Sequence, residues 1–271
     1  MSIRIGFVGG GQMASALAGG AVAAGFVDES ELAFNQPPTP RQAALRERFP
    51  VSTIHDEAAP LFADCEKIVL SVKPHILRSI GATLKEYVTP KHLLLSVASG
   101  LTLMELSELL GSTRVIRVMP NTPSLVGEGA AAMAAGDGCQ DQDVVWVREM
   151  MQSVGKVIEL TDDQIHAFTG IAGSSPAYIY TVIEALSDGG VAQGLPRHVA
   201  TEMAAQAVLG AAKMVLETGI HPGALKDQVT SPGGTTIAAL RTLESNGVRS
   251  AFMEAVASCV QRSREMEKAT D

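Results

Sequence analysis

The chain has 271 residues, of which 46% are hydrophobic and 18% charged, so it carries enough apolar material for a folded core and too much for a disordered chain. Its 21 Lys and Arg residues against 29 Asp and Glu give a net charge of −8, without a basic run that could neutralise phosphates. The most apolar windows, such as Ile68–Val72 and Leu93–Ala98, are far shorter than the roughly 20 residues that span a bilayer. We therefore expect a globular protein without nucleic-acid or membrane partners.

The N-terminal residues, the cysteines and the histidines bear on location and metal binding. Met1–Ile5 leads into Gly9–Gly11 without the apolar segment of a secretory signal. The three cysteines are far apart, which gives neither a disulfide framework nor metal-ligand spacing. The six histidines show no metal spacing either, and we expect them at surface or capping positions. These features predict a cytoplasmic protein with reduced thiols and no metal site.

Up to residue 162, short β-branched runs alternate with longer helical patterns, which is typical of a parallel sheet with crossover helices. The expected strands are Arg4–Val8, Leu32–Asn35, Val51–Ile54, Ile68–Val72, Leu93–Ala98, Val115–Met119, Ala130–Ala134 and Val157–Leu160. The expected helices are Ala14–Ala24, Arg41–Phe49, Ile76–Tyr87, Leu103–Leu109 and Asp143–Ser153. The first part of the chain is therefore predicted to be α/β, with a Rossmann-type doubly wound sheet.

From Gln164 to Lys268 the strand signal disappears, and Ala, Met, Leu and Glu predict three or four long helices. So many small apolar residues give a thin core, so we expect this part to bury a face against a second subunit. The sequence thus predicts a dinucleotide-binding domain over 1–162 and an all-helical substrate-binding and dimerisation domain over 163–271.

A glycine motif follows the first strand and opens the first helix. Gly9–Ala14 reads G-x-G-x-x-A, in which Gly9 permits the tight turn, Gly11 lets the backbone approach a pyrophosphate, and Ala14 lets the helix pack on the strand. Backbone N–H groups at the helix start, at Gln12 and Met13, are free to hold phosphates. The alternative is a purely structural glycine turn. The motif favours dinucleotide binding.

The end of the second strand bears on the choice between NADP and NAD. An acidic residue that takes the ribose 2′-hydroxyl is typical of NAD sites, whereas here the strand ends at Asn35 and Gln36 and is followed by Arg41. Neutral amides do not repel a 2′-phosphate and an arginine pairs with it, which favours NADP, with NAD left open. Glu31 has the right spacing for an NAD site but lies at the wrong end of the expected strand. The alternative for Arg41 is a solvated position in the first turn of a helix.

Three further loops leave the carboxyl ends of expected strands, where ligands of doubly wound sheets bind. They are Val72–Pro74, Ala98–Gly100 and Met119–Pro123. We expect Val72, Lys73, Pro74, Ala98, Ser99 and Asn121 to line the nicotinamide end, with Lys73 and Asn121 as its polar groups. Lys73 could serve as an acid, although a lysine before proline at a strand end is more often simply exposed.

A second cluster of small and hydroxyl residues precedes a helix in the C-terminal part. Gly233, Gly234, Thr235 and Thr236 lead into an apolar helical pattern, and such a helix start offers N–H groups and hydroxyls suited to a carboxylate. An ordinary Ser/Thr helix cap explains the local pattern equally well. The cluster is a candidate anion site.

Taken together, these motifs resemble the pyrroline-5-carboxylate reductase family, in the same order and over about residues 4–265. The matching stretches are Gly6–Ala14, Val72–Pro74, Val118–Pro123, Gly173–Tyr178 and His221–Thr236. The resemblance implies an oxidoreductase that reduces the cyclic imine 1-pyrroline-5-carboxylate to L-proline with NAD(P)H, the last step of proline biosynthesis, an amino-acid biosynthesis pathway. It also implies a homodimer interlocked through the helical domain, or a higher oligomer.

The same resemblance implies roles for individual residues. The backbone of Gly233–Thr236 would hold the substrate carboxylate, the Thr236 hydroxyl would hydrogen-bond the ring nitrogen as the catalytic group, and Val229 would wall the pocket. No buried acid supplies the imine proton in an obvious way, so Thr236 with an ordered water and a substrate that arrives protonated are both open.

Two other functions are compatible with part of the pattern. A β-hydroxyacid dehydrogenase or imine reductase shares the two-domain plan, but those dehydrogenases carry a catalytic lysine on the first long helix of the second domain, where Ala172–Tyr180 has none. A non-catalytic NADP-sensing module would bind the cofactor without turnover.

Overall fold

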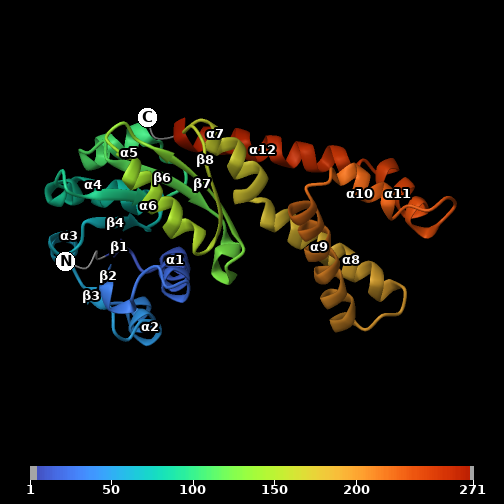
Figure 1. Cartoon of the computed structure of the whole chain (residues 1–271), viewed down its shortest axis with the longest axis horizontal. Coiled ribbons are helices and arrows are strands. Elements are labelled where there is room, and N and C mark those ends of the chain that lie inside the picture. Colours follow the sequence, from blue (N-terminus) through green and yellow to red (C-terminus); the bar gives the residue numbers. More distant parts are fainter. Residues whose placement is uncertain (1–4, 269–271) are drawn as a thin grey trace. The chain divides into compact units, whose positions relative to one another are not determined.

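The structure, a computed structural model, describes residues 5–268. Its chain forms two compact units (Figure 1). One contains the described residues up to Ser174 and again from Cys259 onward, and the other contains Ser175–Ser258. The C-terminal part of the chain, from Cys259 onward, therefore belongs to the first unit.

An eight-stranded sheet forms the centre of the first unit. Its strands are β1 (Ile5–Val8), β2 (Leu32–Asn35), β3 (Thr53–His55), β4 (Lys67–Leu70), β5 (Leu93–Ser96), β6 (Val115–Pro120), β7 (Gly129–Ala135) and β8 (Gly155–Glu159). Their order is β3-β2-β1-β4-β5-β6-β7-β8. The first six strands have the order of a doubly wound nucleotide-binding sheet, in which the chain changes direction between β1 and β4. The predicted α/β fold class is confirmed.

Helices cover both faces of this sheet. They are α1 (Gln12–Ala23), α2 (Pro40–Arg48), α3 (Ala58–Asp64), α4 (Pro74–Tyr87), α5 (Leu103–Leu110), α6 (Asp141–Gln152) and α7 (Gln164–Phe168), with one 3-10 turn η1 (Glu29–Glu31), a second, η2 (Thr122–Val126), and a π-helical turn η3 (Thr169–Gly173). Apolar side chains of α1, α2 and α6 pack on one face, and those of α3, α4 and α5 on the other. Strand residues alternate between these two cores, as the period of two along a strand requires. Burial on both faces explains why the strands read as nearly continuous apolar runs.

The direction of β7 corrects the sequence-based expectation of a parallel sheet. β7 runs antiparallel to β6, with Arg117 opposite Ala134 and Met119 opposite Ala132, whereas the other neighbouring strands pair in parallel. Only residues 121–128, which include the short turn η2 and Gly127 at φ 78°, connect the two strands. A parallel connection needs a crossover of about a dozen residues or more, so the short connection fixes the antiparallel pairing.

The second unit is entirely helical. It contains α8 (Ser175–Ala192), α9 (Arg197–Thr218), α10 (Pro222–Gln228), α11 (Thr235–Ser245) and the first half of α12 (Val248–Lys268). Its fully buried apolar side chains are Ala200 and Ala204, as judged over the described residues 175–258. The core within this unit is therefore thin. By length and composition alone, α9 could also cross a membrane. Only 11% of its most apolar window is buried within the chain.

The eight expected strands all form, with small shifts at their ends. β3 begins at Thr53 because Val51, expected to open it, lies in a turn and is 63% exposed. Arg4, expected to begin the first strand, lies outside the described residues. Helix α3 was not expected, since seven residues that include a proline show no clear helical period.

Candidate active site

A cleft of about 1090 Å³ opens at the carboxyl ends of the parallel strands. It is lined by the loops that follow the first six strands, β1 to β6. Ligands of doubly wound sheets bind at this edge, where the strand order reverses between β1 and β4. The cleft is therefore the candidate cofactor site.

The glycine turn after β1 forms the centre of the cleft. Gly9 has φ 95°, and a Cβ there would lie 2.6 Å from Val72 Cγ1, so both conformation and space require glycine. The N–H of Gly10 donates to Gln36 Oε1 at 3.0 Å, and a Cβ on Gly10 would lie 2.0 Å from Leu45 Cδ1. Other parts of the protein thus occupy the space that a side chain at Gly9 or Gly10 would need, and the positive φ of Gly9 also favours glycine.

Gly11 differs from its neighbours in what surrounds it. Its φ is −76°, and the nearest atom to a Cβ there would be Ser71 O, 4.0 Å away. It is the N-cap of α1, where no side chain caps the helix and the first turn carries no acidic residue. The open space and the uncapped N–H groups together fit a phosphate held at the helix start.

The next three residues of the motif begin α1. Gln12 and Met13 line the cleft, whereas Ala14 is fully buried in the core beneath it. A methyl side chain at this position lets the helix pack closely on the sheet.

Ser71, which follows β4, holds the glycine turn from the other side. Its Oγ lies 3.0 Å from Val8 O and 2.9 Å from Gly9 O, and its N–H donates to Val8 O at 3.0 Å. It also lines the cleft. Sequence reasoning missed Ser71, since a serine after an apolar strand carries no specific signal.

The residues expected to choose between NADP and NAD lie together at the end of β2. Asn35, Gln36 and Arg41 all line the cleft, and Arg41 is exposed in the first turn of α2. Asn35 Nδ2 donates to Asp56 O at 3.2 Å. Glu31 lies in η1 at the amino end of β2, where its carboxylate accepts from the N–H of Asp28 at 3.2 Å. Its position opposite to the cleft end of the strand rules Glu31 out as the ribose ligand.

Two acidic residues that sequence reasoning did not single out also line this part of the cleft. They are Asp56 and Glu57, which follow β3. Gln42 Nε2 donates to Asp56 Oδ1 at 2.7 Å and so holds that carboxylate in place. The sequence indicated only that Asp56 follows the end of a strand. This position points to the cleft once the structure shows that β3 lies next to β2.

The loops after β4 and β5 reach the cleft as expected. Val72, Lys73, Pro74, Ala98 and Ser99 all line it. Lys73 is exposed and is the N-cap residue before α4, with Pro74 at the first helical position.

The loop after β6 is different at Asn121. Met119, Pro120 and Thr122 line the cleft, whereas the Asn121 amide is bound to backbone groups. Its Oδ1 accepts from the N–H of Ala130 at 2.8 Å, and its Nδ2 donates to Ala172 O at 3.0 Å. Direct contact of Asn121 with a cofactor stays a prediction.

The second cluster lies in the helical unit, in the loop between α10 and α11. Gly233 has φ 67°, and the N–H of Gly234 donates to Ser231 O at 3.1 Å in a tight turn. Gly234 is the N-cap of α11, again without a side-chain cap. Val229 is 67% exposed, Thr235 is exposed and Thr236 is half-buried. An uncapped helix start beside two hydroxyls fits an anion site.

The expectation that the histidines occupy surface or capping positions is wrong for two of them. His92 is 1% exposed and its Nε2 lies 2.9 Å from Phe62 O, and burial lowers its pKa. His166 is 4% exposed, between Ser263 and Glu267 of α12. Both rings find polar partners from segments distant in sequence, which a spacing argument does not reveal.

Comparison with known proteins assigns both parts of the chain. Residues 4–100 match the family model "NADP oxidoreductase coenzyme F420-dependent", and residues 162–266 match "Pyrroline-5-carboxylate reductase dimerisation". The pyrroline-5-carboxylate reductase of Arabidopsis thaliana is 42% identical over 267 residues, covering 98% of this chain and 96% of the relative. The reductase of Escherichia coli is 40% identical over 270 residues, 99% of this chain and 100% of the relative. The chain belongs to the pyrroline-5-carboxylate reductase family.

Solved structures of this family agree with the fold. The Coxiella burnetii pyrroline-5-carboxylate reductase has a TM-score of 0.90 at 33% identity, covering 98% of this chain and 99% of that chain. The Plasmodium falciparum pyrroline carboxylate reductase, solved with NADP bound, has a TM-score of 0.87 at 33% identity, covering 98% of both chains. The predicted family is confirmed, which decides against the β-hydroxyacid dehydrogenase alternative.

Proposed function

We propose that this protein reduces 1-pyrroline-5-carboxylate to L-proline with NAD(P)H, the last step of proline biosynthesis. The proposal is carried by near full-length similarity, at 40–43% identity, to reductases from plants, archaea and bacteria. The uncapped helix start at Gly11, with open space where a side chain would be, supports it independently. The chain is thus an enzyme rather than a cofactor-sensing module.

The cleft residues fit a dinucleotide along its length. The N–H groups of the first turn of α1 hold the pyrophosphate, and Gly9, Gly11, Gln12 and Met13 shape that point. Asn35, Gln36 and Arg41 lie at the adenosine end, and the nicotinamide end is lined by Val72, Lys73, Pro74, Ala98 and Ser99. When bound, the nicotinamide supplies the hydride.

NADPH is the proposed preferred cofactor, with NADH as a second possibility. The exposed Arg41 guanidinium is free to pair with a 2′-phosphate. The bound NADP of the Plasmodium falciparum relative supports the same choice. Asp56 and Glu57 on the same part of the cleft oppose it through charge, so the balance depends on Arg41.

The substrate is held by the start of α11 in this proposal. The backbone N–H groups of Gly233–Thr236 bind the carboxylate, since an anion is stabilised at a helix N-terminus. The Thr236 hydroxyl hydrogen-bonds the ring nitrogen, and Val229 forms a wall of the pocket. Fixing the imine in this way lets orientation and electrostatics lower the barrier. The imine proton comes either through Thr236 and an ordered water or with the substrate itself.

The division of labour follows the two halves of the sequence. We assign cofactor binding to residues 1–162 and substrate binding with dimerisation to 163–271, a functional boundary that differs from the compact units at Ser174 and Cys259. The family match over 162–266 supports this division.

Apolar side chains of α8 and α9, including Leu186, Met203, Leu209 and Leu216, are exposed in the single chain, and such a surface is usually buried against a partner.

We propose that a second copy of the chain buries these side chains of α8 and α9 in a dimer interface. A dimer interface accounts for an apolar α9 without a membrane, and larger assemblies of dimers are compatible with it. We assign the enzyme to the cytoplasm, with a small-molecule substrate and no nucleic-acid or membrane partner.

The test is NADPH oxidation by the purified protein with pyrroline-5-carboxylate, followed by absorbance, with proline measured as the product. A 2-oxo acid with NADPH, and 3-hydroxyisobutyrate with NADP, serve as controls for the dehydrogenase reactions. Proline formed in step with NADPH consumed supports the proposal. NADPH binding without turnover, or turnover of a control substrate alone, contradicts it.

A further inference from the structure

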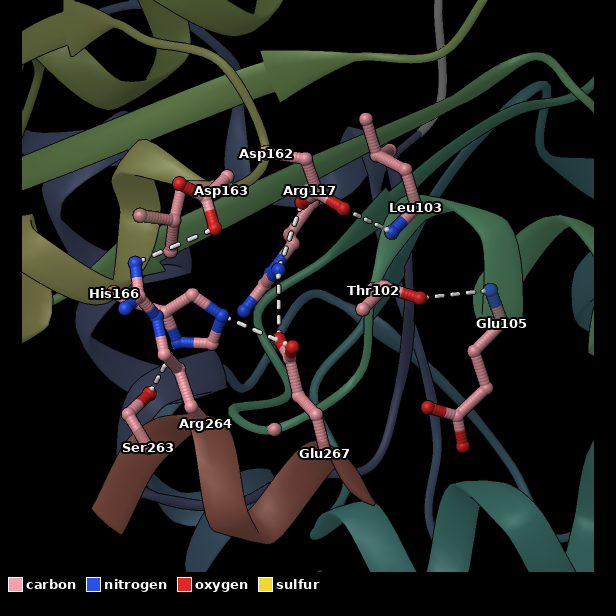
Figure 2. Close-up of polar contacts among 12 residues, drawn as sticks. Thr102, Leu103, Glu105, Arg117, Asp162, Asp163, His166, Ser263, Arg264 and Glu267 are labelled. Carbon is pink, nitrogen blue, oxygen red and sulfur yellow. Dashed lines mark hydrogen bonds and ion pairs between the residues drawn. The ribbon is translucent and has the colours of Figure 1, made fainter. Parts of the chain in front are cut away.

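A buried arginine lies in β6, two residues before the part of that strand that lines the cleft. Arg117 is 3% exposed, and its Nη1 lies 2.7 Å from Asp162 Oδ1 and 3.4 Å from Glu267 Oε1 (Figure 2). The other Asp162 oxygen accepts from the N–H of Leu103 at 2.8 Å. A buried guanidinium is costly without carboxylate partners, so these contacts tie residue 162 firmly to the sheet.

Residue 162 begins a segment, here called the connector, that comprises residues 162–174 and leads to the point where the chain leaves the first unit. The connector lies along one face of the last turns of α12. His166 Nε2 is 3.0 Å from Glu267 Oε2, and His166 Nδ1 is 2.9 Å from Ser263 Oγ (Figure 2). Cys259 Sγ donates to Ser174 Oγ at 3.3 Å. Positions 259, 263 and 267 are four apart, which places them on one side of a helix.

Asn121 fixes the connector at its far end. Its side chain is 8% exposed and joins three segments: the end of β6, the start of β7 at Ala130, and the π-helical turn η3 at Ala172. π-helical turns are rare and often occur at functional sites. η3 also lies beside a residue that lines the cleft, because a Cβ on Gly173 would be 3.4 Å from Met119 Cε.

We propose that Asn121 is a positioning residue for hydride transfer: it fixes the Met119–Thr122 end of the cleft against the connector. This inference rests on the proposed reductase function and names a role within the same site. Both neighbours of Asn121 line the cleft, whereas its own amide is bound to backbone groups. It thus shapes the wall at the nicotinamide end without taking part in the reaction itself.

A positioning role predicts different effects on NADPH affinity and on the rate of hydride transfer, whereas loss of a direct cofactor ligand would change both. In the proposed function NADPH affinity is carried by the helix start of α1 and by Arg41, whereas the Asn121 amide forms its hydrogen bonds with Ala130 and Ala172. The rate of hydride transfer depends on the position of the reacting atoms, where a displacement of about 1 Å costs about a hundredfold. Loss of the Asn121 contacts therefore affects the hydride step and leaves cofactor affinity in place.

The variant Asn121→Asp tests this directly in the intact protein. It keeps the oxygen that accepts from Ala130 and replaces the donor to Ala172 O by a second acceptor. We expect kcat with pyrroline-5-carboxylate to fall by about ten- to a hundredfold. The primary isotope effect with NADPH deuterated at the transferred hydrogen should rise as hydride transfer becomes limiting, and the NADPH Kd from fluorescence titration should not change.

Asp143→Asn is the matched control, since Asp143 is a buried carboxylate of the same unit that pairs with Arg114 away from the cleft. It should lower stability with unchanged kcat and isotope effect. If Asn121→Asp does not fold, Asn121→Ser, which is too short to reach Ala172 O, is read in the same way.

Four outcomes would overturn the inference. A weakened NADPH Kd that accounts for the whole loss in kcat/KM would make Asn121 a cofactor ligand. A lower stability with unchanged kcat and isotope effect, as in Asp143→Asn, would make its role structural. An inactive wild-type enzyme would remove the reductase proposal together with this one, whereas an active wild type with an unaffected variant removes this inference alone.

Discussion

Replacing Gly11 by alanine should weaken NADPH binding while leaving the fold intact. Apart from Gly11 and its two chain neighbours, no residue has an atom nearer than 4.0 Å to the position of the added Cβ, and the φ of −76° suits any residue. In the unfolded chain the substitution removes conformational freedom, which stabilises by about 0.4–1 kcal/mol. At an N-cap, alanine is less favourable than glycine by a similar amount, so the net change in unfolding free energy is within about 1 kcal/mol.

The effect on binding is much larger, because the methyl group occupies the space through which a phosphate approaches the helix start. Displacing the phosphate removes at least one charge-assisted hydrogen bond of about 1.5–3 kcal/mol. Since about 1.4 kcal/mol corresponds to a factor of ten, the NADPH Kd should rise by about ten- to a hundredfold.

Gly10→Ala is the matched control, one residue away and opposite in outcome. Its Cβ would lie 2.0 Å from Leu45 Cδ1 in the core and 3.3 Å from Gln36 Oε1. Overpacking of this kind costs about 1–3 kcal/mol. Urea unfolding and NADPH fluorescence titration of both variants separate the two effects. A Gly11→Ala protein that binds NADPH like the wild type would refute the placement of the phosphate.

Four further predictions follow from the same geometry. Arg41→Ala should lower the ratio of kcat/KM for NADPH over NADH by about ten- to a hundredfold, through loss of a contact of about 1.5–3 kcal/mol, whereas Arg46→Ala on the same helix should not; an unchanged ratio would move the phosphate to Asn35 and Gln36. Thr236→Ala should lower kcat by about ten- to a hundredfold with unchanged NADPH Kd, and Thr236→Ser should keep much of the activity; normal kinetics of the alanine variant would remove Thr236 from the mechanism. Sedimentation should show at least a dimer, which Leu209→Arg weakens and the exposed Met104→Arg in the first unit does not; a monomeric wild type would contradict this. Asp143→Asn should cost about 2–4 kcal/mol at neutral pH, because the buried carboxylate receives Arg114 Nε at 2.8 Å and Nη2 at 2.6 Å. The hydrogen bond from Arg114 lowers the pKa of Asp143 in the folded state. This stabilisation is therefore present above the unfolded pKa of about 4 and is lost as the pH falls through the folded pKa. Urea unfolding should show that the difference in unfolding free energy between wild type and variant is smaller at acid pH than at neutral pH.

Local chemistry made much of the site predictable. Gly9 and Gly11 were identifiable because a tight turn and an open helix start have few sequence solutions, and both lie in the cleft. Asn35 could be placed at the carboxyl end of its strand, and Glu31 at the other end, from the order of residues along the chain. Strand ends in a parallel sheet converge on one edge, which brought the loops after β4 and β5 to the cleft as expected.

The partners of the polar side chains depended on tertiary structure. Ser71 meets Gly9 O across 62 residues, Arg117 meets Asp162 across 45, and His166 meets Glu267 across 101. No local pattern encodes such pairs, because they exist only after the sheet order and the return of α12 have brought the segments together. The nucleotide-binding fold and the glycine turn could be predicted from the sequence, since they follow from hydrophobic periodicity and short-range backbone geometry. The family could be predicted as well, from the resemblance of several motifs in the same order along the chain. The antiparallel direction of β7 follows from its short connection to β6, a local feature that the prediction of a parallel sheet did not use. The support of the glycine turn by Ser71 and the bond from the Asn121 amide to Ala172 O could be known only from the structure, because long-range packing brings these segments together.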